Sequence, residues 1–186
     1  NAQGIVTLDV AVNVAIDSVG NNNTAATQHS LTFDSVVPTV NITGSANVNG
    51  AFTATITFSE TVSGFTVADI IANNASLGAL STISGSVYTV LVTPTSDGAV
   101  TLDIAGSVAT DSAVNNNTAA TQFNSSFDGT PPTVTISDIV ADPYNAAFTA
   151  TFTFSETVTG FTVADIVAGN ANLSAFSTTS GSVYTA

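Results

Sequence analysis

The sequence predicts an all-β protein built from tandem β-sandwich repeats with a period of about 95 residues, and three observations support this prediction. First, residues 52–70 (FTATITFSETVSGFTVADI) return almost unchanged as residues 148–166 (FTATFTFSETVTGFTVADI). Second, each copy begins with apolar residues that alternate with threonines, which is the pattern of a strand with one buried face. Third, no stretch of the chain keeps the 3.6-residue period of a helix.

The flanking segments belong to the same repeat. Residues 4–10 (GIVTLDV) match residues 98–104 (GAVTLDI) at an offset of 94 residues. Towards the other end, residues 180–186 (SGSVYTA) match residues 84–90 (SGSVYTV) at an offset of 96 residues. The chain therefore holds one complete repeat, preceded by the end of one repeat and followed by the start of another.

Two Asp-x-x-x-Pro segments, DSVVP at residues 34–38 and DGTPP at residues 128–132, mark the expected domain boundaries. Proline stiffens a short connection and prevents a central strand from running through it. The change of offset is expected in a loop near Asp142 and Pro143. The expected domains are the closing strands of a preceding repeat (1–37), one complete repeat (38–130) and the opening strands of a following repeat (131–186).

The complete repeat should contain about seven short strands separated by turns. This number of strands in about 90 residues predicts an immunoglobulin-like β-sandwich. The alternation of apolar residues places Tyr88, Val90 and Val92 in its core. The expected strands cover residues 39–43, 52–58, 65–72, 76–82, 86–93, 99–105 and 118–127.

The charge of the chain limits its partners. It has no Lys or Arg and 13 Asp and Glu residues. Binding to nucleic acid or to an anionic membrane surface is disfavoured, because nothing neutralises phosphate. The absence of Cys excludes disulfides and thiolate metal sites, and there is no apolar run long enough for a membrane-spanning helix. The acidic residues either lie scattered on a polar surface or gather to bind cations.

Three motifs of the complete repeat resemble a known family. They are FSETVSGFTVADI (58–70), ATDSAVNNNTA (109–119) and FDGTPPTVTI (127–136). Together they are similar to the bacterial Ig-like repeats of giant surface adhesins and RTX-type extracellular proteins, and the resemblance covers essentially the whole chain. It implies an extracellular, rod-like array of domains that is often stiffened by calcium.

A cation site is expected at the linker into the complete repeat. In an immunoglobulin-like sandwich, the loop after the second strand and the loop between the last two strands lie at the same end. The chain also enters the first strand from that end, which should bring Asp34, Glu60 and Asp111 together. Asn115 and Asn116 would add amide oxygens, and hard oxygen ligands of mixed type suit Ca²⁺.

The same set is expected at the next linker, with Asp128 and Glu156. Its third acid would be the equivalent of Asp17, supplied from outside this chain. The alternative is that the linker aspartates form turns, that the glutamates are solvated, and that Asp111 caps a turn through its own backbone. The sequence leaves both interpretations open, since it contains no DxDxDG-like run of ligands.

Other polar residues have simpler explanations. Asp69 and Asp165 are expected to cap short helical turns rather than to bind metal. His29 is the only histidine, and its counterpart in the complete repeat is Phe123. We therefore expect a surface or partly buried imidazole. Since no G-x-S-x-G nucleophile motif occurs either, we expect no enzyme activity.

These observations predict a structural segment of an extracellular adhesin or filament that acts as a rigid extender or scaffold in cell adhesion or matrix formation. Its expected partners are identical neighbouring repeats in a linear fibre and an unidentified cell-surface or glycan receptor. A carbohydrate-binding module is a second alternative, which the absence of Trp and the presence of only three Tyr disfavour.

The incomplete repeats at both ends should be completed by strands from outside this chain, because they leave apolar surface and open strand edges exposed. Two explanations fit. The sequence is a window on a longer array, as is usual for such repeats. Alternatively, the chain is a subunit of a self-polymerising filament whose copies complete one another head to tail by strand donation.

Overall fold

The computed structural model describes residues 3–137 and 144–186. The chain divides into two compact units, Asn1–Gly129 and Thr130–Ala186. The predicted loop at Asp142 and Pro143 lies outside the described residues.

The first sheet of unit 1 contains four antiparallel strands in the order β3-β5-β8-β7. One of its two central strands, β5, has the bounds that the alternating pattern predicted, and its apolar residues face the core while most of its threonines face outward. The strands are β3 (Val40–Thr43), β5 (Phe52–Phe58), β7 (Ala75–Thr82) and β8 (Val87–Pro94).

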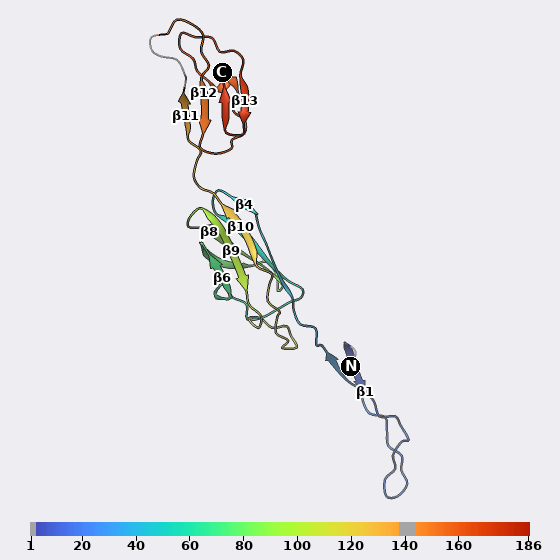
Figure 1. The fold of residues 1–186 in the computed structure, drawn as a ribbon. Coiled ribbons are helices and arrows are strands. Elements are labelled where there is room, and N and C mark those ends of the chain that lie inside the picture. Colours follow the sequence, from blue (N-terminus) through green and yellow to red (C-terminus); the bar gives the residue numbers. More distant parts are fainter. Residues whose placement is uncertain (1–2, 138–143) are drawn as a thin grey trace. The chain divides into compact units, whose positions relative to one another are not determined.

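The second sheet of unit 1 has the order β4-β10-β9-β6. With the first sheet it forms the two-layered ABED and CFG arrangement of an immunoglobulin-like sandwich, in which β10 lies between β4 and β9 (Figure 1). The strands are β4 (Asn47–Val48), β6 (Ile70–Asn73), β9 (Gly98–Ile104) and β10 (Phe123–Phe127).

Three features differ from the predicted strands. The last strand begins at Phe123 rather than at residue 118, because the preceding backbone bonds elsewhere: the Thr118 N–H donates to the Pro38 carbonyl oxygen at 2.9 Å. The third strand, β6, begins at Ile70 rather than at residue 65, and the stretch before it forms the short helical turn expected at Asp69, a 3₁₀ helix, η1 (Val67–Asp69). Strand β4 was not predicted, because it is only two residues long and pairs in parallel with β10.

The core lies between the two sheets. Residues from both sheets, including Ile56, Val90 and Leu102, are almost completely buried in one apolar cluster. At one end of this cluster three aromatic rings meet, with centroids 5.1 Å apart for Phe58 and Phe65 and 5.2 Å apart for Phe65 and Tyr88. Aromatic edge-to-face contacts of this kind strengthen a core beyond the area that they bury.

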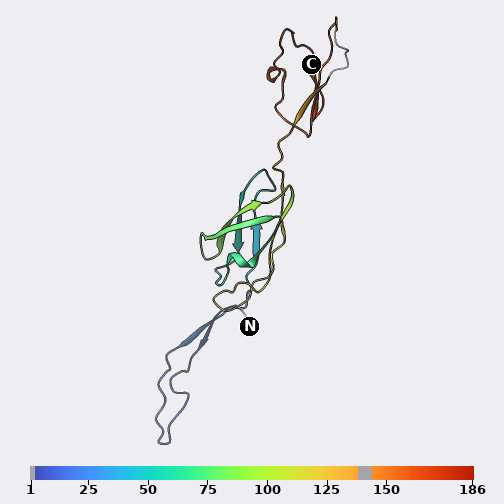
Figure 2. The same ribbon diagram turned by 90° about the vertical axis from the view of Figure 1, so that its left-hand side faces the viewer.

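The N-terminal segment of unit 1 forms a hairpin of β1 (Gly4–Leu8) and β2 (His29–Phe33), drawn in blue in Figures 1 and 2. Its two strands pair with the register that β9 and β10 have: Gly4 lies opposite Phe33 as Gly98 lies opposite Phe127. The hairpin is therefore a local copy of the last two strands of the sandwich, with its apolar residues exposed.

Unit 2 contains one sheet, ordered β11-β12-β14-β13, which repeats the order of the first sheet of unit 1. An aromatic cluster forms here too, with ring centroids 5.1 Å apart for Phe161 and Tyr184. Within residues 130–137 and 144–186 no second sheet is formed. The elements are β11 (Val134–Ser137), β12 (Thr151–Phe154), η2 (Val163–Asp165), β13 (Ser177–Ser180) and β14 (Val183–Thr185).

Candidate cation site at the linker

Asp111 stands in the loop between β9 and β10 and is only 5 % exposed. Its Oδ1 accepts hydrogen bonds from the backbone N–H groups of Ala113 (2.8 Å) and Asn115 (2.9 Å), and its Oδ2 accepts one from Asn115 Nδ2 (2.9 Å). These bonds, that of the Asn115 side chain above all, favour the ionised form and lower the pKa of Asp111 although partial burial opposes them. The loop therefore holds a charged carboxylate in a fixed position.

Asn117 shapes the base of the same loop and was missed by the sequence analysis. Its Oδ1 accepts hydrogen bonds from the N–H groups of Val108 (2.9 Å) and Ala109 (2.8 Å). Its Nδ2 donates to the carbonyl oxygens of Ala105 (3.0 Å) and Thr118 (2.8 Å), which joins the two ends of the loop. The repeated NNN triplet was the available signal, but three adjacent asparagines do not reveal which one is buried.

Asp34 lies in the linker that enters the sandwich and forms a turn there. Its Oδ1 accepts hydrogen bonds from the Val36 N–H (3.0 Å) and from Gln3 Nε2 (2.9 Å). Its backbone oxygen accepts a bond from Asn115 Nδ2 (3.3 Å), which ties the linker to the β9–β10 loop. This turn was one of the two interpretations of Asp34 that the sequence left open. The turn still allows the Asp34 carboxylate to face Glu60 and Asp111.

Glu60 follows β5 in a loop that is tied to the β9–β10 loop. The Ser63 N–H donates to the Thr110 carbonyl oxygen at 2.7 Å, and the Thr110 N–H donates to the Ser63 carbonyl oxygen at 3.1 Å. Partial desolvation raises the pKa of Glu60, and repulsion from Asp111 and Asp34 raises it further. The negative charge of Glu60 is therefore disfavoured where it stands.

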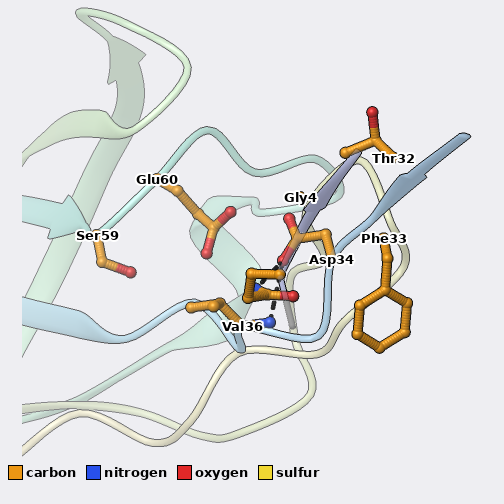
Figure 3. A pocket seen from close by; sticks show the side chains of 8 residues that line it. Gly4, Thr32, Phe33, Asp34, Val36, Ser59 and Glu60 are labelled. Atoms are coloured by element: carbon orange, nitrogen blue, oxygen red, sulfur yellow. Dashed lines mark hydrogen bonds between the residues drawn. The ribbon is translucent and has the colours of Figure 1, made fainter. Parts of the chain in front are cut away.

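The three acids form one cluster, as the sequence predicted. Carboxylate oxygens of Asp34, Glu60 and Asp111 lie within 4.8 Å of one another. Figure 3 shows the Asp34 and Glu60 side chains beside an open hollow of about 410 Å³, which Gln3 also lines. Three carboxylates in a chain without Lys or Arg form a donor set of hard oxygens, which fits Ca²⁺ better than a thiolate- or imidazole-binding metal.

The side-chain amide of Asn115 is oriented differently from that expected for a metal ligand. It turns its amide nitrogen, rather than its oxygen, towards Asp111 and the Asp34 carbonyl. In this arrangement it holds the acids in position, and its amide would have to turn over to offer an oxygen to a cation.

The remaining predicted ligands are not members of this cluster. Asp128 belongs to unit 1 and Glu156 to unit 2, which are described separately, so the predicted second site stays a prediction. Asp17 is exposed at the far end of the hairpin loop. Its carboxylate nevertheless accepts hydrogen bonds from the Val19 N–H (2.9 Å), the Asn21 N–H (2.9 Å) and Asn21 Nδ2 (2.8 Å), the same turn as in the complete repeat.

The predicted capping role of two aspartates is confirmed. Asp69 Oδ2 accepts hydrogen bonds from the Thr66 N–H (2.8 Å) and Oγ1 (2.9 Å) at the start of η1. Asp165 and Thr162 repeat this arrangement at η2, with both distances 2.9 Å. Both carboxylates therefore stabilise the start of a 3₁₀ helix rather than bind a ligand.

The predicted position of His29 is also confirmed, since it is exposed on β2. Tyr88 and Tyr184 are buried in the aromatic clusters, and Tyr144 is exposed beside Phe148. Among the described residues, tyrosines therefore do not form an aromatic platform for sugars.

The two sheets, their strand order and the loops that meet at one end define an immunoglobulin-like β-sandwich repeat. The chain belongs to the bacterial Ig-like domain family, whose model matches residues 34–127 and 128–186. Members of this family are typically non-enzymatic and often extracellular. A comparison with curated proteins finds no match for this chain. No helix among the described residues is long and apolar enough to cross a membrane.

Proposed function

We propose that this chain is a structural segment of a bacterial surface adhesin or extracellular filament, in which its repeats act as rigid extenders. The observation that carries the proposal is tandem repetition: two copies of the same family domain follow one another without an intervening segment. An array that repeats one domain gains length with each copy and contacts chiefly its neighbours. A giant adhesin or RTX-type protein is the setting that the motifs favour, with a surface or glycan receptor bound elsewhere in the molecule.

The linkers support this extender role. Both begin with an aspartate and end in proline, and proline restricts the conformations of a short connection. At the first linker, side chains of the hairpin and of the loops bind the backbone: Gln3 Oε1 accepts a hydrogen bond from the Ser35 N–H (2.9 Å), and Asn115 Nδ2 donates to the Asp34 carbonyl oxygen. A linker held in this way transmits stiffness between consecutive domains. In this proposal the domains have the limits 1–37, 38–130 and 131–186.

Ca²⁺ is the cofactor that this proposal assigns to the linker. Asp34, Glu60 and Asp111 would hold it, and they come from the linker and from two loops that are distant in sequence. The ion would supply positive charge to a cluster that has no Lys or Arg to neutralise it. The residues of the chain do the rest: Asn115 positions the Asp111 carboxylate, and the Ser63–Thr110 backbone pair keeps the two loops together.

Surface labelling tests the extender role. Antibodies raised against residues 38–130 should label intact cells of the source bacterium, or the matrix around them, without permeabilisation. Deleting successive repeats from the full-length protein should reduce the reach of the surface layer in proportion to the number removed. Labelling that appears only after lysis would contradict the proposal.

A further inference from the structure

The connection between β4 and β5 contains a chemically reactive pair that neither the core nor the cation site uses. Its residues are Asn49, Gly50 and Ala51, and Asn49 is the only asparagine of the chain that a glycine follows. The backbone nitrogen of the residue after an asparagine can attack the side-chain carbonyl carbon. Glycine obstructs this attack least, because it has no Cβ. The pair is therefore a candidate for a modification that needs no enzyme.

The structure leaves both reacting groups free. Asn49 is exposed and lies in a bend outside the strands. Among the residues that the structure describes, neither the Asn49 side chain nor the Gly50 N–H has a hydrogen-bond partner. A Cβ placed on Gly50 would meet nothing within 4 Å, so the space around this residue is open. No contact of the fold therefore holds the two groups apart.

Other asparagines of the complete repeat are held in place by their side chains. Asn74 Nδ2 donates hydrogen bonds to the carbonyl oxygens of Ser96 (2.7 Å) and Ala99 (3.2 Å). Asn117 is only 3 % exposed, and its amide joins the two ends of the β9–β10 loop. A residue with a Cβ follows each of them in the sequence. Fold and sequence together therefore distinguish Asn49 from these residues.

We propose that Asn49 deamidates spontaneously, which makes the β4–β5 connection a site of self-modification. The Gly50 nitrogen loses its proton and forms a bond to Cγ of Asn49. The side-chain nitrogen takes up a proton and leaves as ammonia. Water then opens the resulting succinimide ring at either carbonyl carbon, which gives aspartate or isoaspartate at this position. This inference goes beyond the proposed function and does not depend on it.

The new carboxylate would stand at the end of the sandwich where the chain leaves the complete repeat. Asn49 follows Val48, whose carbonyl oxygen accepts a hydrogen bond from the Asp128 N–H (3.0 Å). Beside it, the Gly129 N–H donates to Oδ1 of Asp97 (2.7 Å). Deamidation therefore adds a negative charge to the segment that holds the start of the second linker, in a chain without Lys or Arg to neutralise it.

The isoaspartate product would also change the backbone beside β4. This strand has only two residues and pairs in parallel with the end of β10. Isoaspartate adds a carbon atom to the main chain directly after Val48. The added atom should weaken the bonds that the Ser126 and Asp128 N–H groups donate to the Ala46 and Val48 carbonyl oxygens. Modified molecules would therefore hold the start of the second linker less firmly.

Unit 2 supplies a matched control within the same chain. Asn145 and Ala146 are the counterparts of Asn49 and Gly50 at the offset of 96 residues. Asn145 is exposed as well, so burial does not distinguish the two asparagines. The Cβ of Ala146, however, obstructs attack by its backbone nitrogen. Asn145 should therefore keep its amide under conditions in which Asn49 loses its own.

Isoelectric focusing after prolonged incubation at mildly alkaline pH tests the proposal, because the attacking nitrogen must lose a proton. A more acidic band should grow at the expense of the original band, since each deamidation adds a negative charge. Mass spectrometry of fragments cut at acidic residues locates the change, because the chain offers trypsin no site. The mass shift should lie on Asn49, within the fragment between Asp34 and Glu60, and not on Asn145.

Gly50→Ala should lose most of the acidic product. The substitution fits the structure, because the added Cβ meets nothing and unit 2 has Ala146 at the matching position. An unfolding transition at least as stable as that of the wild type would show that the fold is intact. An equal reaction of Gly50→Ala would overturn the proposal. So would a folded wild-type chain in which Asn49 keeps its amide while the urea-unfolded chain loses it.

Discussion

Residues 98–127 and 4–33 are matching segments of the repeat in different surroundings, and comparing them separates local from long-range determinants. The strand register is the same in both. So is the loop, since Asn23 repeats the hydrogen bonds of Asn117, for example those from the Val14 N–H (2.9 Å) and the Ala15 N–H (2.8 Å) to its Oδ1. Burial differs, because it requires the facing sheet. Hairpin and loop geometry are therefore encoded locally, whereas the core is not.

The largest effect should come from truncating a core leucine. Leu102→Ala removes a fully buried side chain and should destabilise the complete repeat by about 3 kcal/mol. The matched substitution Leu8→Ala changes an exposed side chain and should shift stability by less than about 0.5 kcal/mol. Urea unfolding of both variants measures the difference, and equal losses would show that the hairpin shares a core with the complete repeat.

The loop asparagine should give the next largest effect. Asn117→Ala leaves buried backbone groups without partners and should cost about 2 kcal/mol. Asn23→Ala exposes the corresponding groups to water, so its effect on the unfolding of the complete repeat should be negligible. A large effect of Asn23→Ala on that transition would show that the hairpin loop stabilises the sandwich.

The sequence predicted most of the fold because its signals are local and repeated. The alternation in residues 52–58 gave β5 its bounds, and the loop order of an immunoglobulin-like sandwich placed Asp34, Glu60 and Asp111 together. Strand β4 and the late start of β10 were missed, because both depend on contacts with distant parts of the chain. The orientation of the Asn115 amide was missed for the same reason, since composition does not specify which end of an amide faces a carboxylate.

Calcium should act on the complete repeat through Glu60. At a free concentration about ten times the dissociation constant, binding should stabilise the fold by about 1.4 kcal/mol. Glu60→Gln should abolish this effect, whereas Asp103→Asn, at a carboxylate outside the cluster, should keep it. Thermal unfolding with and without Ca²⁺ measures both, and an equal response of the Glu60→Gln variant would exclude Glu60 as a ligand.

Without Ca²⁺ the same residue should give a pH dependence of opposite sign to that of Asp111. The pKa of Glu60 is raised in the folded protein, so ionisation of Glu60 opposes folding. The contribution of Glu60 to the free energy of unfolding therefore falls as the pH rises from the ordinary pKa of 4.5 through the raised pKa. The lowered pKa of Asp111 means that its stabilisation is present above 3.8 and is lost as the pH falls through the lowered pKa. Glu60→Gln should therefore be more stable than wild type at neutral pH in EDTA.

The smallest effect should come from a backbone conformation that distinguishes the two loops. Val114 has φ of 67°, in the left-handed region that disfavours a β-branched residue, and its counterpart Gly20 has φ of 94°. Val114→Gly should relieve this strain and stabilise the complete repeat by about 1 kcal/mol. Urea unfolding measures the change, and a loss of stability would mean that the greater conformational entropy of glycine in the unfolded chain outweighs the strain relieved.

Hydrogen exchange tests most directly the claim that strand register is encoded locally, whereas a protected core requires the facing sheet. In this chain, backbone amides of residues 100–104 should exchange slowly, and those of the matching residues 6–10 should exchange fast. Equal protection of residues 6–10 and residues 100–104 would contradict the account.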